Sequence, residues 1–168
     1  MVPFCSFRSV WVGVSFGMEI TLPERTAAVR RHAARLCRDL GWAPLHEVSL
    51  PNGRRADILA LRRDGDFACI EVKSGAVGFL TDSKWPDYRA FSDALYFAVD
   101  ADFPQGLLPG DVGLIVTADD GAAMVREAPL HRMASARRRA LTHRFASLAA
   151  CRLEGIIDPL DRFALSCE

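Results

Sequence analysis

The sequence has no excess of charge of either sign, no long apolar run and no paired-cysteine motif. Its 168 residues carry 21 Lys plus Arg and 21 Asp plus Glu, so no overall positive field attracts nucleic acid. No apolar run approaches the roughly 20 residues that span a bilayer, which argues against a membrane protein. The five cysteines include no C-x-x-C pair. We therefore expect reduced thiols in a cytoplasmic protein, with neither a zinc site nor a disulfide framework.

What the sequence does contain is the ordinary composition of a globular domain, with 50% apolar and 25% charged residues. Apolar periodicity, capping residues and turn residues indicate alternating helices and strands. We expect an α/β sandwich in which helices flank one mixed central sheet. The predicted helices are 21–40, 82–94 and 130–153, and the predicted strands are 45–50, 56–61, 67–73, 95–99, 112–116 and 122–126.

The two ends of the chain differ from the central domain, which we place at residues 18–153 and which includes a basic C-terminal helix. Residues 1–17 are expected to be an N-terminal extension, either disordered or upstream of a true start at Met18. The competing interpretation is an extra edge strand through 10–14. Residues 154–168 are expected to form a C-terminal tail.

The most informative feature is the segment Ile70–Lys73 together with Asp57, which lies 14 residues before Glu71. These charged residues interrupt short apolar runs, where charges are rarely buried unless they are paired or hold a metal. Two carboxylates can bind a divalent cation, and a neighbouring lysine can serve an attacking water or a developing negative charge. The residue types therefore predict a metal-dependent phosphodiesterase. The alternative is an exposed ion pair of little energetic consequence.

Such a site makes a demand on the turn between the two strands. Directly opposed residues of an antiparallel pair point to the same face. A two-residue turn at Asp64–Gly65 would place Asp57 opposite Val72, on the wrong face. A three-residue loop, Arg63–Gly65 with a left-handed glycine, would place it opposite Glu71. The metal-site hypothesis therefore predicts the longer loop, or a bulge that restores the register.

The residue types also suggest individual roles. We expect Asp57 and Glu71 to hold Mg²⁺ or Mn²⁺, with the backbone carbonyl of Val72 as a further ligand. Water and a substrate phosphate oxygen would complete the shell. The metal would lower the pKa of a bound water and neutralise charge on phosphorus. Lys73 would orient that water or stabilise the charge.

Asp57 followed by Glu71-x-Lys73, on a hairpin after a helix and a strand, resembles the PD-(D/E)XK nuclease superfamily. Most of the chain, roughly 18–153, is more closely similar to the bacterial MmcB-type DNA repair proteins. This resemblance implies a three-layer restriction-endonuclease-like sandwich that acts on DNA in the response to DNA damage. It also implies Asp57 and Glu71 as metal ligands and Lys73 as the catalytic lysine. The similar segments are 47–57, 70–74, 84–88 and 97–99.

Some positions depart from the family pattern. Ala56 stands where the family has a structural proline before the first acid. Lys84-x-x-x-Tyr88 replaces the Gln-x-x-x-Tyr of some branches. The nuclease interpretation has Lys84 contact a phosphate and Tyr88 buttress the site, against a solvated lysine and a core tyrosine. Many members have a third carboxylate, for which the candidates are Glu24 and Glu47, although the helix dipole equally explains a first-turn Glu24.

Charge is segregated along the chain. The first and last predicted helices are rich in arginine, whereas residues 82–102 are acidic. Arg54 and Arg55 adjoin Asp57, so we expect them to contact the substrate through their guanidinium groups. The run 137–139 is more typical of a solvated helix face. An acidic helix beside a basic one permits a homodimer without requiring it.

The main hypothesis is a small metal-dependent DNA nuclease that works in repair. A second hypothesis is a non-catalytic module with the same fold that recognises DNA or a repair partner, which the balanced net charge favours. A third keeps the enzyme class and changes the substrate to RNA. The residues do not discriminate between DNA and RNA.

Overall fold

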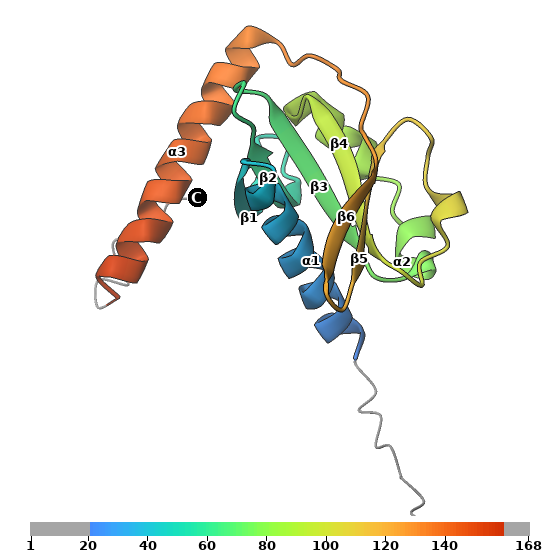
Figure 1. Cartoon of the computed structure of the whole chain (residues 1–168). Coiled ribbons are helices and arrows are strands. Elements are labelled where there is room, and N and C mark those ends of the chain that lie inside the picture. Colours follow the sequence, from blue (N-terminus) through green and yellow to red (C-terminus); the bar gives the residue numbers. More distant parts are fainter. Residues whose placement is uncertain (1–20, 160–168) are drawn as a thin grey trace, which may run out of the picture.

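A computed structural model describes residues 21–159 and centres on one six-stranded sheet (Figure 1). The strands lie side by side in sequence order. The third, fourth and fifth strands run parallel, and every other neighbouring pair is antiparallel, so the sheet is mixed as expected. The strands are β1 (Ala43–Ser49), β2 (Arg55–Leu61), β3 (Phe67–Lys73), β4 (Ala94–Asp100), β5 (Gly113–Ala118) and β6 (Gly121–Arg126).

One face of this sheet is covered by the helix α1 (Leu22–Asp39), seen in blue in Figure 1. Val29 and Cys37 of α1 pack in one buried cluster with Ile58 of β2 and Ile70 of β3. Because these apolar positions recur at helical spacing, α1 presents one stripe to the sheet and leaves Arg31, Arg35 and Arg38 exposed on the other side.

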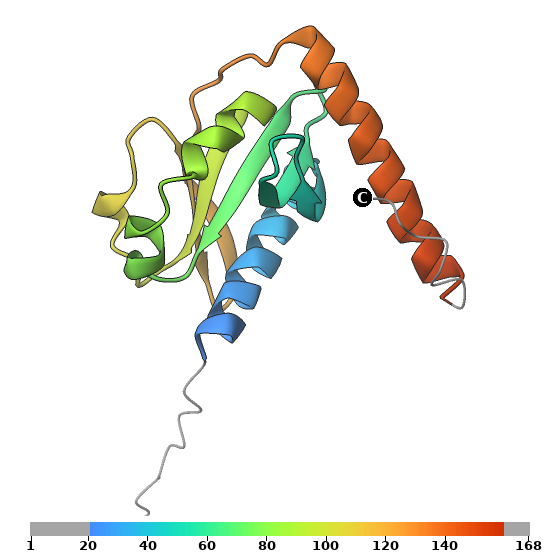
Figure 2. The same ribbon diagram turned by 180° about the vertical axis from the view of Figure 1, so that it is seen from behind.

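The opposite face is covered by shorter elements and by the start of the last helix (Figure 2). Phe79 packs edge-on against Phe97, with ring centroids 5.3 Å apart, and Phe145 packs against Phe67 at 5.6 Å. Helices therefore flank the mixed sheet on both sides, which confirms the expected α/β architecture. The elements are α2 (Ala76–Leu80), the 3-10 helices η1 (Trp85–Phe91) and η2 (Gln105–Leu107), and α3 (Ser135–Ile157).

The first helix begins and ends where its sequence signals predict. Glu24 accepts hydrogen bonds from the backbone nitrogen of Thr21 at 2.9 Å and from its hydroxyl at 2.8 Å, which forms a capping box. At the other end Gly41 has a φ of +74°, the left-handed conformation that ends helices.

The prediction of a single helix over 82–94 is wrong. The region from 76 to 91 forms the short helix α2, an extended stretch and the 3-10 helix η1. The Asp82 carboxylate does not cap a helix, because one of its oxygens pairs with Lys73 and the other accepts the backbone nitrogen of Lys84. Pro86 lies in the first turn of η1, where its missing N–H is tolerated.

The last helix begins and ends later in the sequence than predicted. It starts at Ser135 rather than at residue 130, and it continues to Ile157, beyond the boundary expected at 153. His131 and Met133 remain extended because their backbone nitrogens donate to the backbone and side chain of Asp93, each at 2.8 Å.

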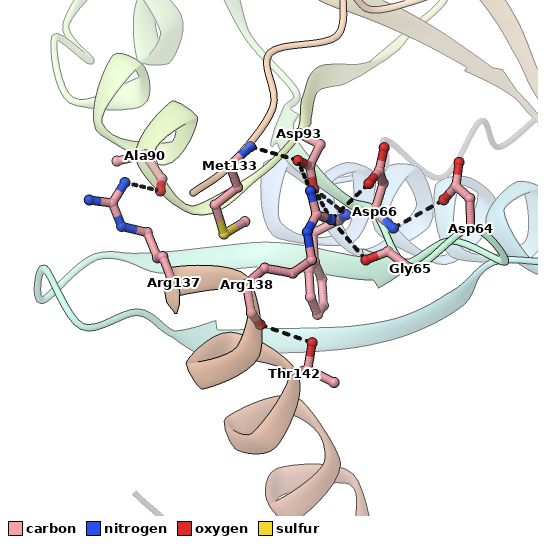
Figure 3. A network of polar contacts seen from close by, with 10 residues as sticks. Asp64, Gly65, Asp66, Ala90, Asp93, Met133, Arg137, Arg138 and Thr142 are labelled. Atoms are coloured by element: carbon pink, nitrogen blue, oxygen red, sulfur yellow. Dashed lines mark hydrogen bonds and ion pairs between the residues drawn. The ribbon is translucent and has the colours of Figure 1, made fainter. Parts of the chain in front are cut away.

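Asp93 anchors the last helix to the sheet (Figure 3). Its carboxylate is fully buried and accepts the backbone nitrogens of Phe67 and Met133, each at 2.8 Å. Both terminal nitrogens of Arg138 in α3 donate hydrogen bonds to the same carboxylate, at 2.6 and 2.8 Å. Arg138 also binds Asp66 and the carbonyl of Gly65. This arginine is thus an internal clamp and not the solvated side chain that its arginine-rich run suggests.

The remaining expectations concern the cysteines and the chain ends. Cys37 and Cys69 are free and buried, as predicted. Cys151 is disulfide-bonded, which corrects the expectation of reduced thiols throughout. Among the described residues, no helix is both long enough and apolar enough to cross a membrane. The predicted extension 1–17 and most of the predicted tail lie outside the described residues.

Candidate functional site

The β2–β3 hairpin has the loop that the metal-site hypothesis requires. The backbone nitrogen of Arg62 donates to the carbonyl of Asp66 at 2.8 Å, so the loop consists of 63–65. Gly65 has a φ of +87°, as predicted for the left-handed position. Ile58 is paired with Ile70, and continuing this register by one residue sets Asp57 opposite Glu71.

The two acidic side chains meet where the β2–β3 ladder opens. The backbone nitrogen of Val72 donates to the carboxylate of Asp57 at 2.8 Å, and the backbone nitrogen of Asp57 approaches a carboxylate oxygen of Glu71 at 3.4 Å. The Asp57 side chain thus takes the place of a partner strand. Because the N–H and C=O of one strand residue point to the same side, the Val72 carbonyl faces this opening too.

Burial gives both carboxyls an unusual proton affinity. Glu71 is only 4% exposed, and this burial together with the nearby charge of Asp57 raises its pKa to about 8. Burial also raises the pKa of Asp57, although the hydrogen bond from Val72 opposes the increase. A cation placed between the two carboxyls would favour their ionised forms. The pair is therefore suited to hold either a proton or a metal ion.

Lys73 projects from the same face of β3 and pairs with Asp82, a residue that sequence reasoning missed. Its ammonium nitrogen lies 2.5 Å from a carboxylate oxygen of Asp82, and the two side chains are only 14% and 21% exposed. The sequence predicts instead that Asp82 begins a helix. A signal is nevertheless present, because aspartate side chains in turns commonly bind the backbone two residues on. The Asp82 carboxylate does accept the Lys84 nitrogen at 2.9 Å.

These side chains line one cavity of about 760 Å³. It lies where the end of β3 meets the first turns of α1 and the β1–β2 loop. The hydroxyls of Thr26 and Ser74 lie 2.5 Å apart and join α1 to the end of β3 at its rim. The lining residues are Thr26, Ser49, Gly53, Arg54, Arg55, Asp57, Glu71, Val72, Lys73, Asp82, Lys84 and Tyr88.

The four residues predicted to contact substrate all lie at this cavity, but two arginines are already engaged. Arg54 donates twice to one carboxylate oxygen of Asp87, at 2.9 and 2.8 Å. Arg55 pairs with Glu47 at 2.7 Å, and its side chain is 68% exposed. The exposed position of Arg55 leaves it accessible to a second anion.

The other two predicted contacts differ in burial. Tyr88 is nearly buried, and its hydroxyl donates to the carbonyl of Arg55 at 3.1 Å, so it braces the wall of the cavity. Lys84 is exposed and immediately precedes η1. Both residues therefore lie at the cavity, Tyr88 as a nearly buried part of its wall and Lys84 as an exposed cation.

Neither candidate for a third carboxylate lines the cavity. Glu24 belongs to the capping box of α1. Glu47 lies in β1 between the residues that pair with Ile58 and Ala56, so it stands across from Asp57. It is the only non-glycine residue with a positive φ in the described part of the chain, at +50°. Its carboxylate is bound by Arg30 and Arg55, which turn it toward them.

The oxygen atoms that could hold a metal are few. Within residues 21–159 there is no group of three or more His, Cys, Asp or Glu placed to bind one ion. The available donors are the Asp57 and Glu71 carboxylates and the Val72 carbonyl. Two carboxylates with room for water and a phosphate oxygen fit Mg²⁺, which often keeps several waters, better than they fit a structural zinc site.

Comparisons with known proteins give a family match and a similar solved structure. The profile of the family described as DNA repair protein MmcB-like matches residues 17–160. A solved structure, that of a protein of unknown function from Silicibacter pomeroyi, superposes with a TM-score of 0.77 at 36% sequence identity. The similarity covers 82% of this chain and 94% of that chain. No curated protein matches.

Proposed function

The chain belongs to the MmcB-like DNA repair protein family, and on that premise we propose that it is a metal-dependent nuclease of the PD-(D/E)XK type acting on DNA. The observation that carries the proposal is the convergence of Asp57, Glu71 and Lys73 on one cavity. The three-residue loop of the β2–β3 hairpin puts the two acids on one face. A simple ion pair on the surface would require neither this register nor the burial of Glu71.

The acid pair supports a bound divalent cation, Mg²⁺ or Mn²⁺. Because Glu71 is buried and Asp57 is half-buried beside it, ionisation of both carboxyls calls for a counter-charge. Lys73 supplies only part of this counter-charge, because its ammonium group is paired with Asp82. When bound, the cation would supply the Lewis acidity that activates water and offsets charge on the phosphorus. Asp57, Glu71 and the Val72 carbonyl would hold it.

The remaining residues of the cavity have complementary roles. Asp82 fixes the Lys73 ammonium group in one direction, so that it can hydrogen-bond the attacking water or a phosphoryl oxygen. Arg55 and Lys84 supply exposed positive charge for the flanking phosphates. Tyr88 keeps the β1–β2 loop against η1 through its bond to the Arg55 carbonyl.

The decisive test measures cleavage and binding separately. Purified protein is incubated with duplex, single-stranded, flap and branched DNA in Mg²⁺ or Mn²⁺. We expect Lys73→Ala to bind DNA as the wild type does and to lose cleavage by a factor of about 10² to 10³, the usual cost of removing one such charge. Arg132→Ala is the matched control, because it removes an exposed cation that lies outside the cavity, and it should cut normally. Equal cutting by Lys73→Ala and wild type would refute the assignment.

A second candidate is a non-catalytic module of the same fold that binds DNA or a repair partner. The pairing of Arg54 with Asp87 and of Arg55 with Glu47 favours this second candidate over a nuclease. Guanidinium groups that already have acidic partners are less available to hold a substrate phosphate in the cavity. In that case wild type and Lys73→Ala would be equally inert on every substrate while both bind DNA. The same assay with RNA of matched sequence distinguishes a ribonuclease.

A further inference from the structure

Arginines without an acidic partner run along the solvent side of α1, away from the cavity, and continue into the segment 62–63 that follows β2. Within residues 21–159 none of them forms an ion pair, in contrast to Arg54 and Arg55, which line the cavity. We call them the α1 arginine surface: Arg31, Arg35, Arg38, Arg62 and Arg63.

Three members of this surface share one face of α1. Arg31, Arg35 and Arg38 are spaced by four and three residues, so they are neighbours on the helix, and all three are exposed. At a rise of about 1.5 Å per residue they extend over roughly 10 Å. The buried stripe that contains Val29 and Cys37 lies on the other side of α1.

The loop members are held in place beside the end of α1. The Arg62 guanidinium lies over the ring of Trp42, 4.7 Å from its centroid. The Arg63 guanidinium covers Gly41, where an added Cβ would come within 2.4 Å of its Nε. Both groups are thus ordered against the chain that follows Arg38. An ordered cation loses less conformational entropy when it binds an anion.

Folding alone gives no reason for the placement of Arg31 and Arg35. Like charges at i and i+4 on a helix, such as Arg31 and Arg35, are destabilising by a few tenths of a kcal/mol. The helix dipole favours a cation only in the last turn, where Arg38 lies. The acids of the same segments, Asp39 and Asp64, are exposed and form no ion pair within the described residues. The surface is therefore a net positive patch whose arginines form no ion pair within the described part of the chain.

We propose that the α1 arginine surface binds the phosphodiester backbone of DNA at a distance from the catalytic cavity. α1 itself connects the two places, because Thr26 in its first turns lines the cavity and Arg38 lies in its last turn. The intervening 12 residues of helix span about 18 Å, which equals about five base-pair steps of 3.4 Å. This inference rests on the proposed function for the identity of the polyanion.

The test compares two double variants that remove the same charge. Arg31→Gln/Arg35→Gln removes two members of the surface. Arg132→Gln/Arg139→Gln removes two arginines that lie outside it and that are likewise exposed and without an ion pair among residues 21–159. Each pair is introduced into the Lys73→Ala background, so that cleavage does not interfere. Binding of a fluorescent 20-base-pair duplex is followed by anisotropy between 50 and 200 mM salt.

We expect the surface variant to make the negative slope of log affinity against log salt shallower by about 1.8, because each of the two lost phosphate contacts contributes about −0.9. The control variant should keep the parent slope. An unchanged slope in the surface variant, or an equal loss in the control, would overturn the inference. Failure of the parent to bind duplex would overturn it as well.

The two proposals can fail separately. If Lys73-dependent cleavage is observed and the surface variant binds like its parent, only the α1 arginine surface is refuted. If the surface variant loses salt-dependent affinity while the wild type never cleaves, the surface is supported and the nuclease assignment is refuted.

Discussion

Two buried carboxylates, one beside each end of strand β3, differ in how they are hydrogen-bonded. Beside the start of β3, Asp93, the residue that precedes β4, is fully buried and receives four hydrogen bonds, two from backbone nitrogens and two from Arg138. At the end of β3, Glu71 is almost as buried, and the one hydrogen bond that it receives from the described residues is the weak contact from the Asp57 nitrogen. The pKa of Asp93 is lowered by those hydrogen bonds in spite of its burial, whereas burial raises the pKa of Glu71 to about 8.

This difference separates a carboxylate that is fully engaged in the fold from one that has capacity left for a ligand. A buried carboxylate with every lone pair satisfied contributes to the fold and has no capacity left for a ligand. A buried carboxylate with too few donors is unfavourable in the isolated protein and becomes favourable when a cation arrives. Substitutions and ligands that act on one end of β3 alone should therefore sharpen the contrast.

Breaking the satisfied end should have the largest effect. Asp93→Ala leaves Arg138 and two backbone nitrogens without their partner, and breaking a buried pair in this way costs about 3–5 kcal/mol. Urea denaturation would measure the loss in the free energy of unfolding. Asp93→Asn, which keeps the shape, should lose less. A cost below about 1 kcal/mol for the alanine variant would show that the clamp is not important for stability.

Filling the unsatisfied end should stabilise the protein. At a free Mn²⁺ concentration one hundred times the dissociation constant, binding to the folded state alone adds about 2.7 kcal/mol. The melting temperature should therefore rise with added Mn²⁺ and return on chelation with EDTA. Asp57→Asn should abolish the rise. A metal-dependent shift of the same size in Asp57→Asn would place the ion elsewhere.

Removing the charge of Glu71 should stabilise the metal-free protein at high pH. The pKa in the folded state, about 8, lies above the ordinary value of 4.5. The folded protein therefore keeps a proton that the unfolded chain loses, and stability declines as the pH rises from 4.5 through 8. Glu71→Gln escapes this decline, so its free energy of unfolding should exceed that of the wild type at pH 8.5 in EDTA.

The pH dependence provides the control for Glu71→Gln. At pH 4.5 both proteins carry an uncharged side chain at this position, and their free energies of unfolding should converge. A constant difference at every pH would indicate a packing effect instead of a proton.

The smallest effect is expected at the wall of the cavity. Tyr88→Phe removes the hydroxyl that donates to the Arg55 carbonyl, and loss of one such bond costs about 1 kcal/mol. Because the β1–β2 loop would then be less firmly held, the Michaelis constant for DNA should rise more than the turnover number falls. Thermal denaturation and steady-state kinetics measure the two effects. An unchanged stability would indicate that water replaces the hydroxyl.

Features governed by local sequence are predictable in this chain. The start of α1 follows from Thr21 and Glu24, its end from Gly41, and the β2–β3 loop from the need to set Asp57 opposite Glu71. Each depends on residues close in the chain or on strand alternation. The same alternation is enough to place the acid pair and Lys73 on one face of the hairpin.

Features governed by long-range partners are not predictable in the same way. Asp82 resembles a helix start because its partner Lys73 lies nine residues away across the cavity. Arg138 resembles a solvated residue because Asp93, 45 residues away, is unremarkable in sequence. The displaced start of α3 has the same origin, since Asp93 holds the preceding residues extended. Side chains that satisfy distant partners override the local signal.

The left-handed conformation of Gly65 restricts which residues the turn 63–65 can accept. Its φ of +87° is one that side chains adopt only with strain, a β-branched side chain most of all. A β-branched residue at this position would favour another turn geometry, and a pairing slipped by one residue would turn the side chains of one strand over. A single substitution there could thus separate Asp57 from Glu71 without altering any residue that lines the cavity.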